Sequence, residues 1–598
     1  MMKFLLTAIN AKYIHSNPAI YSLRGYAGET LRQYTELAEY TINQPLQDIM
    51  ADIYHRKPEV IGFSCYIWNW SMVQELLEEL PKLLPETDIW LGGPEVTYDA
   101  QELLGKYPQV TGIMVGEGEA TFKELLEYYV GNKAQKTGNN GKDSANFQDI
   151  AGLCLPGGYT RPRELIDMNE LPFLYEDLTP FANKIIYYET SRGCPYRCSY
   201  CLSSIDKRVR LRDISVVKRE LQFFLDNKVL QVKLVDRTFN CNHTHAMEIW
   251  QYIYEHDNGV TNFHFEISAD ILQEDELQLL HKMRPGLVQL EIGVQSVNPQ
   301  TIQAIDRIMN VDKLERIVNR LHSGHNIHQH LDLIAGLPYE DYESFGKSFD
   351  RVYAMKPQQL QLGFLKVLKG SPMHERAKEY GIVYMDRPPY EVLYTRWLSY
   401  EAVLRLKRVE EMVELYYNSN QYMHTLPFLE RAFKSPFVMY ETLAGFYEEK
   451  GYFVNSPARV YRYQVLLEFA KKYDGEHTQI YRELLLYDMY LRENLKSRPD
   501  FAGAVGDEDT RERICAFYQR EERERLYLPD YSDYDWKQLS KMTHLEPFYY
   551  PVWSGRELEN VVRRQEGHQE NTPAAYVLFD YKNRNPLTSE AATAVIYL

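Results

Sequence analysis

The chain of 598 residues has few cysteines, no long apolar run and less positive than negative charge. Seven cysteines, an odd number that is small for this length, argue against a disulfide framework. No stretch approaches the roughly 20 apolar residues that cross a bilayer, and the N-terminus lacks a signal-peptide cleavage pattern. We therefore expect a cytoplasmic protein without a membrane partner. The 67 basic and 84 acidic residues leave a net charge of −17, which argues against nucleic acid as a partner.

Residues 1–133 contain five apolar segments, each followed by an amphipathic one. This alternation predicts five βα units in a doubly wound, flavodoxin-like parallel sheet, where ligands bind at the carboxyl ends of the strands. Small and polar residues follow three of these strands: Ser64, Gly92-Gly93 and Gly116–Glu119. The predicted strands are Lys3–Ile9, Glu36–Ile42, Glu59–Cys65, Asp88–Gly93 and Thr111–Gly118.

A second alternating series covers residues 184–385, after a connecting segment at 134–183. Its six βα units are too few for a complete eight-stranded barrel, which favours a partial (β/α)6 barrel of the TIM type, with its chemistry at the carboxyl ends of the strands. Residues 386–598 form a mainly α-helical C-terminal domain that carries no motif for a chemical role. The predicted barrel strands are Ile185–Thr190, Gln231–Phe239, Phe263–Ala269, Val288–Gln295, His330–Ile334 and Gln359–Val367, and a late strand is expected at Tyr576–Asp580.

Three of the seven cysteines, Cys194, Cys198 and Cys201, lie in a C-x3-C-x2-C pattern directly after a predicted strand. Three thiolates on one loop can bind three irons of a [4Fe–4S] cluster and leave the fourth iron open for a chelating cofactor. A structural zinc site is the alternative, but it requires four ligands, and only Cys241 and His243 are candidates for the fourth. The triplet therefore predicts an iron–sulfur cluster.

The triplet, with the aromatic Tyr200 before its last cysteine, resembles the radical S-adenosylmethionine superfamily. That resemblance implies contacts to S-adenosylmethionine from six residues, although the usual Gly-Gly pair after the second barrel strand is absent. These are Asp236, Thr238, Glu266, Gln295, Arg307 and Asp332. The phrases that carry the resemblance over about 184–381 are Leu234–Phe239, Phe263–Ser268, Glu291–Ser296 and Asp332–Pro338.

The first domain resembles the cobalamin-binding domain that precedes the radical domain in one large subgroup, on the phrases Gly92–Tyr98 and Gly116–Glu119. The resemblance implies that Ser64, Gly92, Gly93, Glu117, Gly118 and His15 contact cobalamin. The Asp-x-His-x-x-Gly signature of many corrinoid proteins is missing. His15 is therefore either a cobalt ligand or an ordinary loop histidine. The alternative for the whole domain is a flavodoxin-like module that binds no ligand.

The family resemblance implies a cobalamin-dependent radical enzyme that methylates an unreactive carbon of a small molecule or peptide, with flavodoxin or ferredoxin as electron donor. Two alternatives stay open: a rearrangement or ring formation with the same cofactors, and a corrinoid sensor or carrier without turnover. A methylthiotransferase is excluded, because residues 1–150 contain only Cys65 and cannot build its second cluster. No side chain is assigned as a catalytic acid, base or nucleophile.

Overall fold

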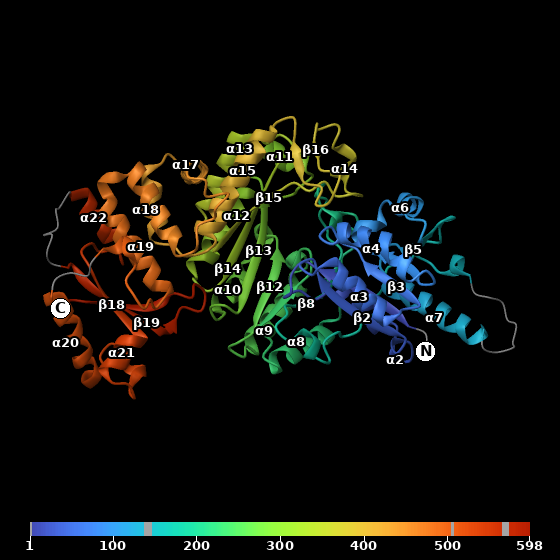
Figure 1. The fold of residues 1–598 in the computed structure, drawn as a ribbon, viewed down its shortest axis with the longest axis horizontal. Helices are drawn as coiled ribbons and strands as arrows, with labels where there is room; N and C mark the ends of the chain where they lie inside the picture. Colours follow the sequence, from blue (N-terminus) through green and yellow to red (C-terminus); the bar gives the residue numbers. More distant parts are fainter. Residues whose placement is uncertain (1–2, 137–145, 504–507, 565–572) are drawn as a thin grey trace.

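The structure is a computed structural model that describes residues 3–136, 146–503, 508–564 and 573–598. Three regions follow one another along the longest axis of the molecule in chain order (Figure 1). A sheet with helices on both faces lies at one end, a curved sheet lies in the middle, and a mainly helical region lies at the other end. The predicted fold class is confirmed.

The first sheet has seven strands in the order β2-β1-β3-β4-β5-β6-β7, of which the first five are parallel. This is the flavodoxin-like order for five βα units. Separate apolar cores on its two faces bury β1 completely, which explains its unbroken apolar sequence. The strands are β1 Phe4–Asn10, β2 Thr35–Thr41, β3 Val60–Ser64, β4 Asp88–Gly92, β5 Val110–Met114, β6 Leu153–Leu155 and β7 Gly158–Tyr159.

Helices α1 and α7 contribute to the core on one face of this sheet, and α3, α4 and α6 to the core on the other. The antiparallel strands β6 and β7 come from the segment that the sequence predicts as a connection, and they extend the sheet beyond β5. The helices are α1 Pro18–Tyr26, α2 Glu29–Arg32, α3 Leu46–Arg56, α4 Trp70–Leu83, α5 Pro94–Thr97, α6 Ala100–Lys106 and α7 Glu119–Lys136.

The middle sheet has six parallel strands in chain order, β8-β11-β12-β13-β14-β15, and its two edges do not pair with each other. The residues of β13 alternate strictly between buried and half-buried, because one face packs on the outer helices and the other lines the interior of the partial barrel. The strands are β8 Ile186–Tyr188, β11 Gln231–Leu234, β12 Asn262–Ile267, β13 Val288–Gln295, β14 His328–Ala335 and β15 Gln359–Phe364. The helices are α8 Ile214–Asp226, α9 His243–Glu255, α10 Glu274–Lys282, α11 Pro299–Ala304, α12 Val311–Ser323, α13 Tyr342–Tyr353 and α14 Pro372–Arg376.

The C-terminal region packs its helices against the β14–β15 side of the barrel and ends in a three-stranded antiparallel sheet (Figure 1). The expected late strand lies within β19, whereas the sequence did not predict β18 or β20. Short strand pairs β9–β10 and β16–β17 complete the fold. The remaining elements are β9 Ser191–Arg192, β10 Arg210–Leu211, β16 Val383–Tyr384, β17 Val392–Tyr394, α15 Tyr400–Met412, α16 Thr425–Leu429, α17 Pro436–Glu449, α18 Tyr461–Tyr473, α19 Thr478–Arg492, α20 Glu508–Glu524, α21 Trp536–Met542, β18 Thr543–Phe548, α22 Gly555–Arg564, β19 Ala575–Arg584 and β20 Ala591–Ile596. Among the residues that the structure describes, none of the helices has the length and apolar character that a bilayer crossing requires.

Candidate functional site

The three cysteines of the triplet lie on the loop that follows β9, at the carboxyl end of the barrel. Cys194 and Cys198 are buried and Cys201 is half-buried. The loop needs a glycine before its first cysteine: Gly193 has φ +91°, and a Cβ atom there would lie 2.2 Å from the Arg208 carbonyl oxygen. The sequence therefore makes this turn possible and brings the segment around Arg208 against the cysteine loop.

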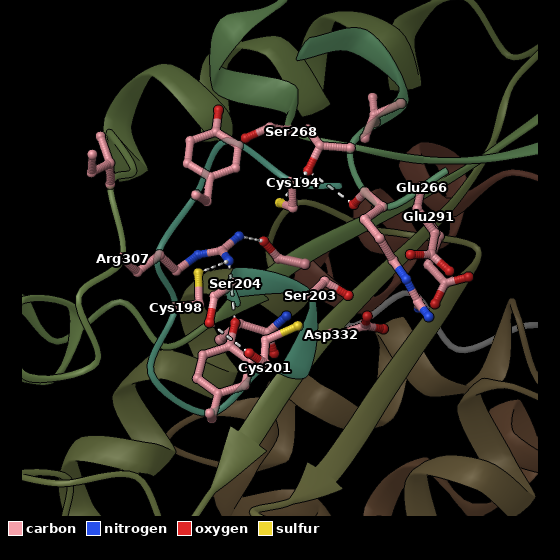
Figure 2. A pocket seen from close by; sticks show the side chains of 18 residues that line it. Cys194, Cys198, Cys201, Ser203, Ser204, Glu266, Ser268, Glu291, Arg307 and Asp332 are labelled. Atoms are coloured by element: carbon pink, nitrogen blue, oxygen red, sulfur yellow. Dashed lines mark hydrogen bonds between the residues drawn. The ribbon is translucent and has the colours of Figure 1, made fainter. Parts of the chain in front are cut away.

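All three thiols line one cavity of about 190 Å3 at the mouth of the barrel. Figure 2 shows Arg307 beside Cys198 on one side of this cavity and Glu266 and Glu291 on the opposite side. Most residues that the sequence assigns to S-adenosylmethionine are brought together here. Thr238, Glu266, Gln295, Arg307 and Asp332 line the cavity, and Asp236 does not.

Asp236 is completely enclosed below the cysteine loop. Its carboxylate accepts hydrogen bonds from the Thr190 backbone N–H and hydroxyl, at 3.0 and 2.6 Å, and from the Ser191 hydroxyl at 2.5 Å. Asp236 thus orders the chain that leads into the triplet. Thr238, two residues later, reaches the thiols instead, with its hydroxyl 3.6 Å from Cys194 Sγ.

Arg307 and Gln295 meet at an irregularity in β13. The pairing of β13 with β14 shifts between Gly293 and Gln295, and Gln295 has φ +71°, as expected of a bulge that redirects a side chain. A Cβ atom on Gly293 would lie 2.4 Å from the Gln295 amide nitrogen, so a glycine is required there. Arg307 donates to Tyr200 at 3.2 Å and to Cys198 Sγ at 3.6 Å. Burial raises the pKa of the Cys198 thiol, and the positive charge of Arg307 offsets part of this shift.

Three carboxyl groups from the adjacent strands β12, β13 and β14 lie together on the cavity wall. Burial raises the pKa of Glu266 to about 7, and the nearby charge of Glu291 adds to the shift. Burial also opposes ionisation of Glu291, but His264 and Lys233, each 3.0 Å away, outweigh it and lower the pKa of Glu291 to about 2. Glu291 was not among the site residues predicted from the sequence; the register of the sheet places it directly opposite Glu266 on the neighbouring strand.

A larger cavity of about 620 Å3 lies between the first domain and the cysteine loop. Five of the six residues that the sequence assigns to cobalamin line it: Ser64, Gly92, Gly93, Glu117 and Gly118. At Gly93, which has φ +112°, a Cβ atom would lie 2.5 Å from the Cys65 carbonyl oxygen. Only glycine allows this close approach of two loops at the carboxyl edge of the sheet.

Glu117 makes ion pairs with the radical domain. It lies 2.5 Å from Arg210 of β10 and 3.4 Å from Arg192 of β9, and it also accepts the backbone N–H of Ile166. Glu119 lies 2.5 Å from Arg192. The loop after β5 is therefore held to the strands that flank the cysteine triplet.

His15, the sixth residue assigned to cobalamin, lines a separate cavity of about 310 Å3. Its Nδ1 atom lies 2.5 Å from the hydroxyl of Tyr187, on β8. The two cavities share Pro18 and Tyr66 in their walls, so they adjoin. Tyr187 supplies the hydrogen-bond partner for the imidazole that the sequence around His15 lacks.

Neither candidate for a fourth zinc ligand is among the described residues that line the thiol cavity. Cys241 does not line it, and His243 lies 3.1 Å from Asp275 instead. A cluster with one open iron needs only the three thiolates that do line it.

Three family models match separate parts of the chain. Residues 5–126 match the B12 binding domain, residues 188–352 match the radical SAM superfamily, and residues 378–576 match a family described as a protein of unknown function (DUF4080). Together, the first two models contain every residue that lines the thiol cavity and the interdomain cavity except Leu165.

Among the relatives is the cobalamin-dependent radical SAM methyltransferase TokK of Streptomyces tokunonensis, 25% identical over 377 residues, which are 58% of this chain and 53% of TokK. The chain thus spans about half the length of that relative. An anaerobic magnesium-protoporphyrin IX monomethyl ester cyclase of Synechocystis sp. is 23% identical over 56% of this chain and 66% of its own. The fold is similar to that of the cobalamin-dependent S-adenosylmethionine radical enzyme OxsB, with a TM-score of 0.54 and 14% identity, over 94% of this chain and 83% of OxsB.

Proposed function

Because the chain belongs to the radical S-adenosylmethionine enzymes that carry a cobalamin-binding domain, we propose that it transfers a methyl group to an unactivated carbon. The proposed substrate is a small molecule or a peptide. The family's cofactors are a [4Fe–4S] cluster, S-adenosylmethionine and cobalamin. Relatives that match more than half of this chain include methyltransferases, which supports methyl transfer over other outcomes.

The observation that carries the proposal is the junction of the two cavities. Arg237 and Ser203 line both the thiol cavity and the larger interdomain cavity, so the two cofactor sites adjoin across two side chains. A substrate at this junction reaches both sites without leaving the protein. Such placement converts two encounters into one bound geometry.

The residues present fit these cofactors. Cys194, Cys198 and Cys201 would hold the cluster at the wall of the thiol cavity. Gln295 Oε1 and Arg307 Nε are buried with no hydrogen-bond partner in the part of the chain that the structure describes, as expected of atoms that await a polar ligand. The glycine loops at the larger cavity would admit the cobalamin tail.

When bound, the cofactors supply a radical that abstracts a hydrogen atom from the substrate and the methyl group that replaces this hydrogen. The chain's own residues would then have two tasks. Arg307 would stabilise the charged thiolate of Cys198, and Glu266, on the wall of the thiol cavity, would accept hydrogen bonds from the ribose hydroxyls. Because the substrate hydrogen leaves as an atom, no side chain has to act as an acid or base on the substrate.

Ring formation with the same cofactors is the second candidate, favoured by the similarity to the magnesium-protoporphyrin cyclase. An anaerobic turnover assay separates the two. Protein reconstituted with cluster and cobalamin is incubated with S-adenosylmethionine, a reductant and candidate substrates, and products are measured by mass spectrometry. Formation of both S-adenosylhomocysteine and 5′-deoxyadenosine, with a substrate gain of one methyl group, supports methyl transfer. Deoxyadenosine with a substrate product that gains no carbon supports ring formation and contradicts the proposal.

A further inference from the structure

Among the residues that the structure describes, the walls of the thiol cavity and the interdomain cavity hold four cationic side chains, all of them arginines. Two of them, Arg192 and Arg210, form the ion pairs with the loop after β5, at 2.5 Å in each case. A third, Arg307, donates to Cys198 and Tyr200 on the cysteine loop. The charge of each of these three arginines therefore has a partner inside the protein.

The fourth arginine, Arg237, has no such partner. Its side chain is exposed, and within the described ranges no ion pair or side-chain hydrogen bond joins it to another residue. It lines both the thiol cavity and the interdomain cavity. A guanidinium keeps its charge at all ordinary pH values and presents five N–H donors, so an unpaired arginine on a cavity wall is suited to bind an anion.

The chain is fixed on both sides of Arg237. The buried Asp236 accepts a hydrogen bond from the Thr190 hydroxyl at 2.6 Å, and the hydroxyl of Thr238 lies 3.6 Å from Cys194 Sγ. These contacts hold the backbone of Arg237 at the edge of the thiol cavity. A fixed backbone limits the movement of the guanidinium, which suits a selective binding group better than a mobile surface charge.

The charge of Arg237 acts on groups in both domains. In the barrel, it opposes the burial that raises the pKa of Glu266 to about 7. In the first domain, it opposes the burial that raises the pKa of Tyr66. The guanidinium therefore lies within electrostatic range of both domains, at the junction where the proposed substrate would bind.

The anionic groups of the two cofactors have other places to bind. The carboxylate of S-adenosylmethionine would chelate the open iron of the cluster. The phosphate of the cobalamin tail would enter with the tail between the glycine loops, whose Gly92 and Gly93 line the interdomain cavity and not the thiol cavity. Arg237, which lines both cavities, is left for a third ligand.

We propose that Arg237 binds an anionic group of the substrate, a carboxylate or a phosphate, and thereby holds the substrate at the junction of the two cavities. This inference rests on the proposed function and narrows its substrate to an anionic small molecule or peptide. Arg237 determines specificity and takes no part in bond formation or cleavage. A neutral analogue of the substrate leaves the cation without its partner and therefore binds more weakly.

Chemical modification of arginine tests this site with the substrate still unidentified. Protein loaded with cluster, cobalamin and S-adenosylmethionine is treated with phenylglyoxal in the absence of a reductant, and peptide mass spectrometry gives the modification rate of each arginine. The protecting ligands are acetate, benzoate and N-acetylglycine, each paired with its neutral carboxamide, and phenyl phosphate. Arg316, which is exposed on α12 and likewise has no ion pair in the described part of the chain, is the internal control.

In the loaded protein, Arg237 should be modified at a rate similar to that of Arg316 and faster than the ion-paired Arg192. At least one of the carboxylates, or phenyl phosphate, should slow the modification of Arg237 about tenfold, whereas the matched carboxamide should not. The rate at Arg316 should stay constant throughout. Because no reductant is present, no methyl group is transferred, and the result is independent of whether the substrate is methylated or cyclised.

Two results overturn the proposal. If Arg237 reacts in the cofactor-free protein but is already protected in the loaded protein, its anion belongs to a cofactor. If no anion protects it, or if carboxylates and carboxamides protect it equally, it does not select an anionic ligand.

The variant Arg237→Gln supplies a second measurement. By calorimetry it should bind the protecting anion about tenfold more weakly than the wild type, whereas the matched control Arg316→Gln should bind it unchanged. Both variants should retain the iron and cobalamin content of the wild type after reconstitution. A fall in the cobalamin content of Arg237→Gln alone would assign the arginine to the corrinoid and overturn the proposal.

Discussion

Arg192 Nη2 lies 2.5 Å from Glu119 Oε1, and this ion pair joins the strand before the cysteine triplet to the first residue of α7 in the first domain. Arg192 also lies 2.9 Å from Glu189, and Glu119 accepts a hydrogen bond from Ser22 at 3.2 Å. The cysteine loop and the interdomain cavity therefore share one network of buried and half-buried charges. Movement of either domain relative to the other would break it.

Replacement of this arginine should weaken the junction of the two domains. Arg192→Gln leaves Glu119, with 7% of its side chain exposed, without its cation, and breaking such a buried pair costs about 3 kcal/mol. Denaturant unfolding followed by fluorescence measures the loss. Arg320→Gln removes an exposed pair with Glu274 and should leave the free energy of unfolding almost unchanged. Equal losses in the two variants would contradict the role assigned to Arg192.

Removal of one thiol of the triplet should abolish the cluster. Cys198→Ala should contain close to no iron and sulfide after anaerobic reconstitution and should form no 5′-deoxyadenosine, because a cluster on two thiolates lacks its third protein ligand. Iron analysis and product analysis check this. Cys515→Ala, at a half-buried cysteine on α20, serves as the matched control and should keep both. Full iron content in Cys198→Ala would exclude the assigned cluster site.

The glycine at the start of α5 should be indispensable for the corrinoid cavity. Gly93→Ala introduces a Cβ atom 2.5 Å from the Cys65 carbonyl oxygen at a φ of +112°, which we expect to destabilise the protein by about 1–3 kcal/mol and to lower the cobalamin bound per chain. Thermal unfolding and the visible spectrum of the reconstituted protein report the two effects. Gly105→Ala in α6, where the added Cβ meets nothing within 4 Å, should be neutral or slightly stabilising. A Gly93→Ala variant with unchanged cobalamin content would argue against this cavity as the corrinoid site.

The binding of S-adenosylmethionine should depend on pH near neutrality. The pKa of Glu266 is about 7, so the group is protonated below this pH, and ribose hydroxyls need its ionised form as an acceptor. The dissociation constant should be about tenfold higher at about pH 6 than at about pH 8, as measured by anaerobic calorimetry on the cluster-loaded protein. Glu266→Gln should bind more weakly and lose this pH dependence, whereas Glu274→Gln on the exposed surface should retain it. An unaltered pH dependence in Glu266→Gln would exclude this carboxyl as its origin.

The same pKa shift has a consequence for stability. Because the pKa of Glu266 is raised above that of an unfolded glutamate, the protonated group favours the folded state below about pH 4.5, and this contribution is lost as the pH rises to about 7. Glu291 behaves in the opposite way. Its pKa of about 2 means that its contribution is present above about pH 4.5 and is lost as the pH falls toward 2.

Local patterns in the sequence were sufficient to predict both parallel sheets. The unbroken apolar run of β1 and the apolar segments at regular spacing identify βα units, because a parallel strand is buried on both faces. Strands β6, β18 and β20 were missed, since short antiparallel strands have weak patterns and depend on partners that are distant in the chain, such as β6 on β5.

The cysteine spacing and the neighbouring glycines could be identified from the sequence alone. A loop that binds a ligand needs its thiols, and the glycines that allow its backbone conformation, within a few residues of one another. The roles of Asp236, Glu291 and His15 were decided by the tertiary structure alone. Asp236 meets Thr190, Glu291 meets Lys233 and His264, and His15 meets Tyr187, each across a separation of 27 residues or more. The charge, burial and hydrogen bonding of these side chains depend on which residues the fold brings within about 3 Å, and a hydrogen bond requires that proximity.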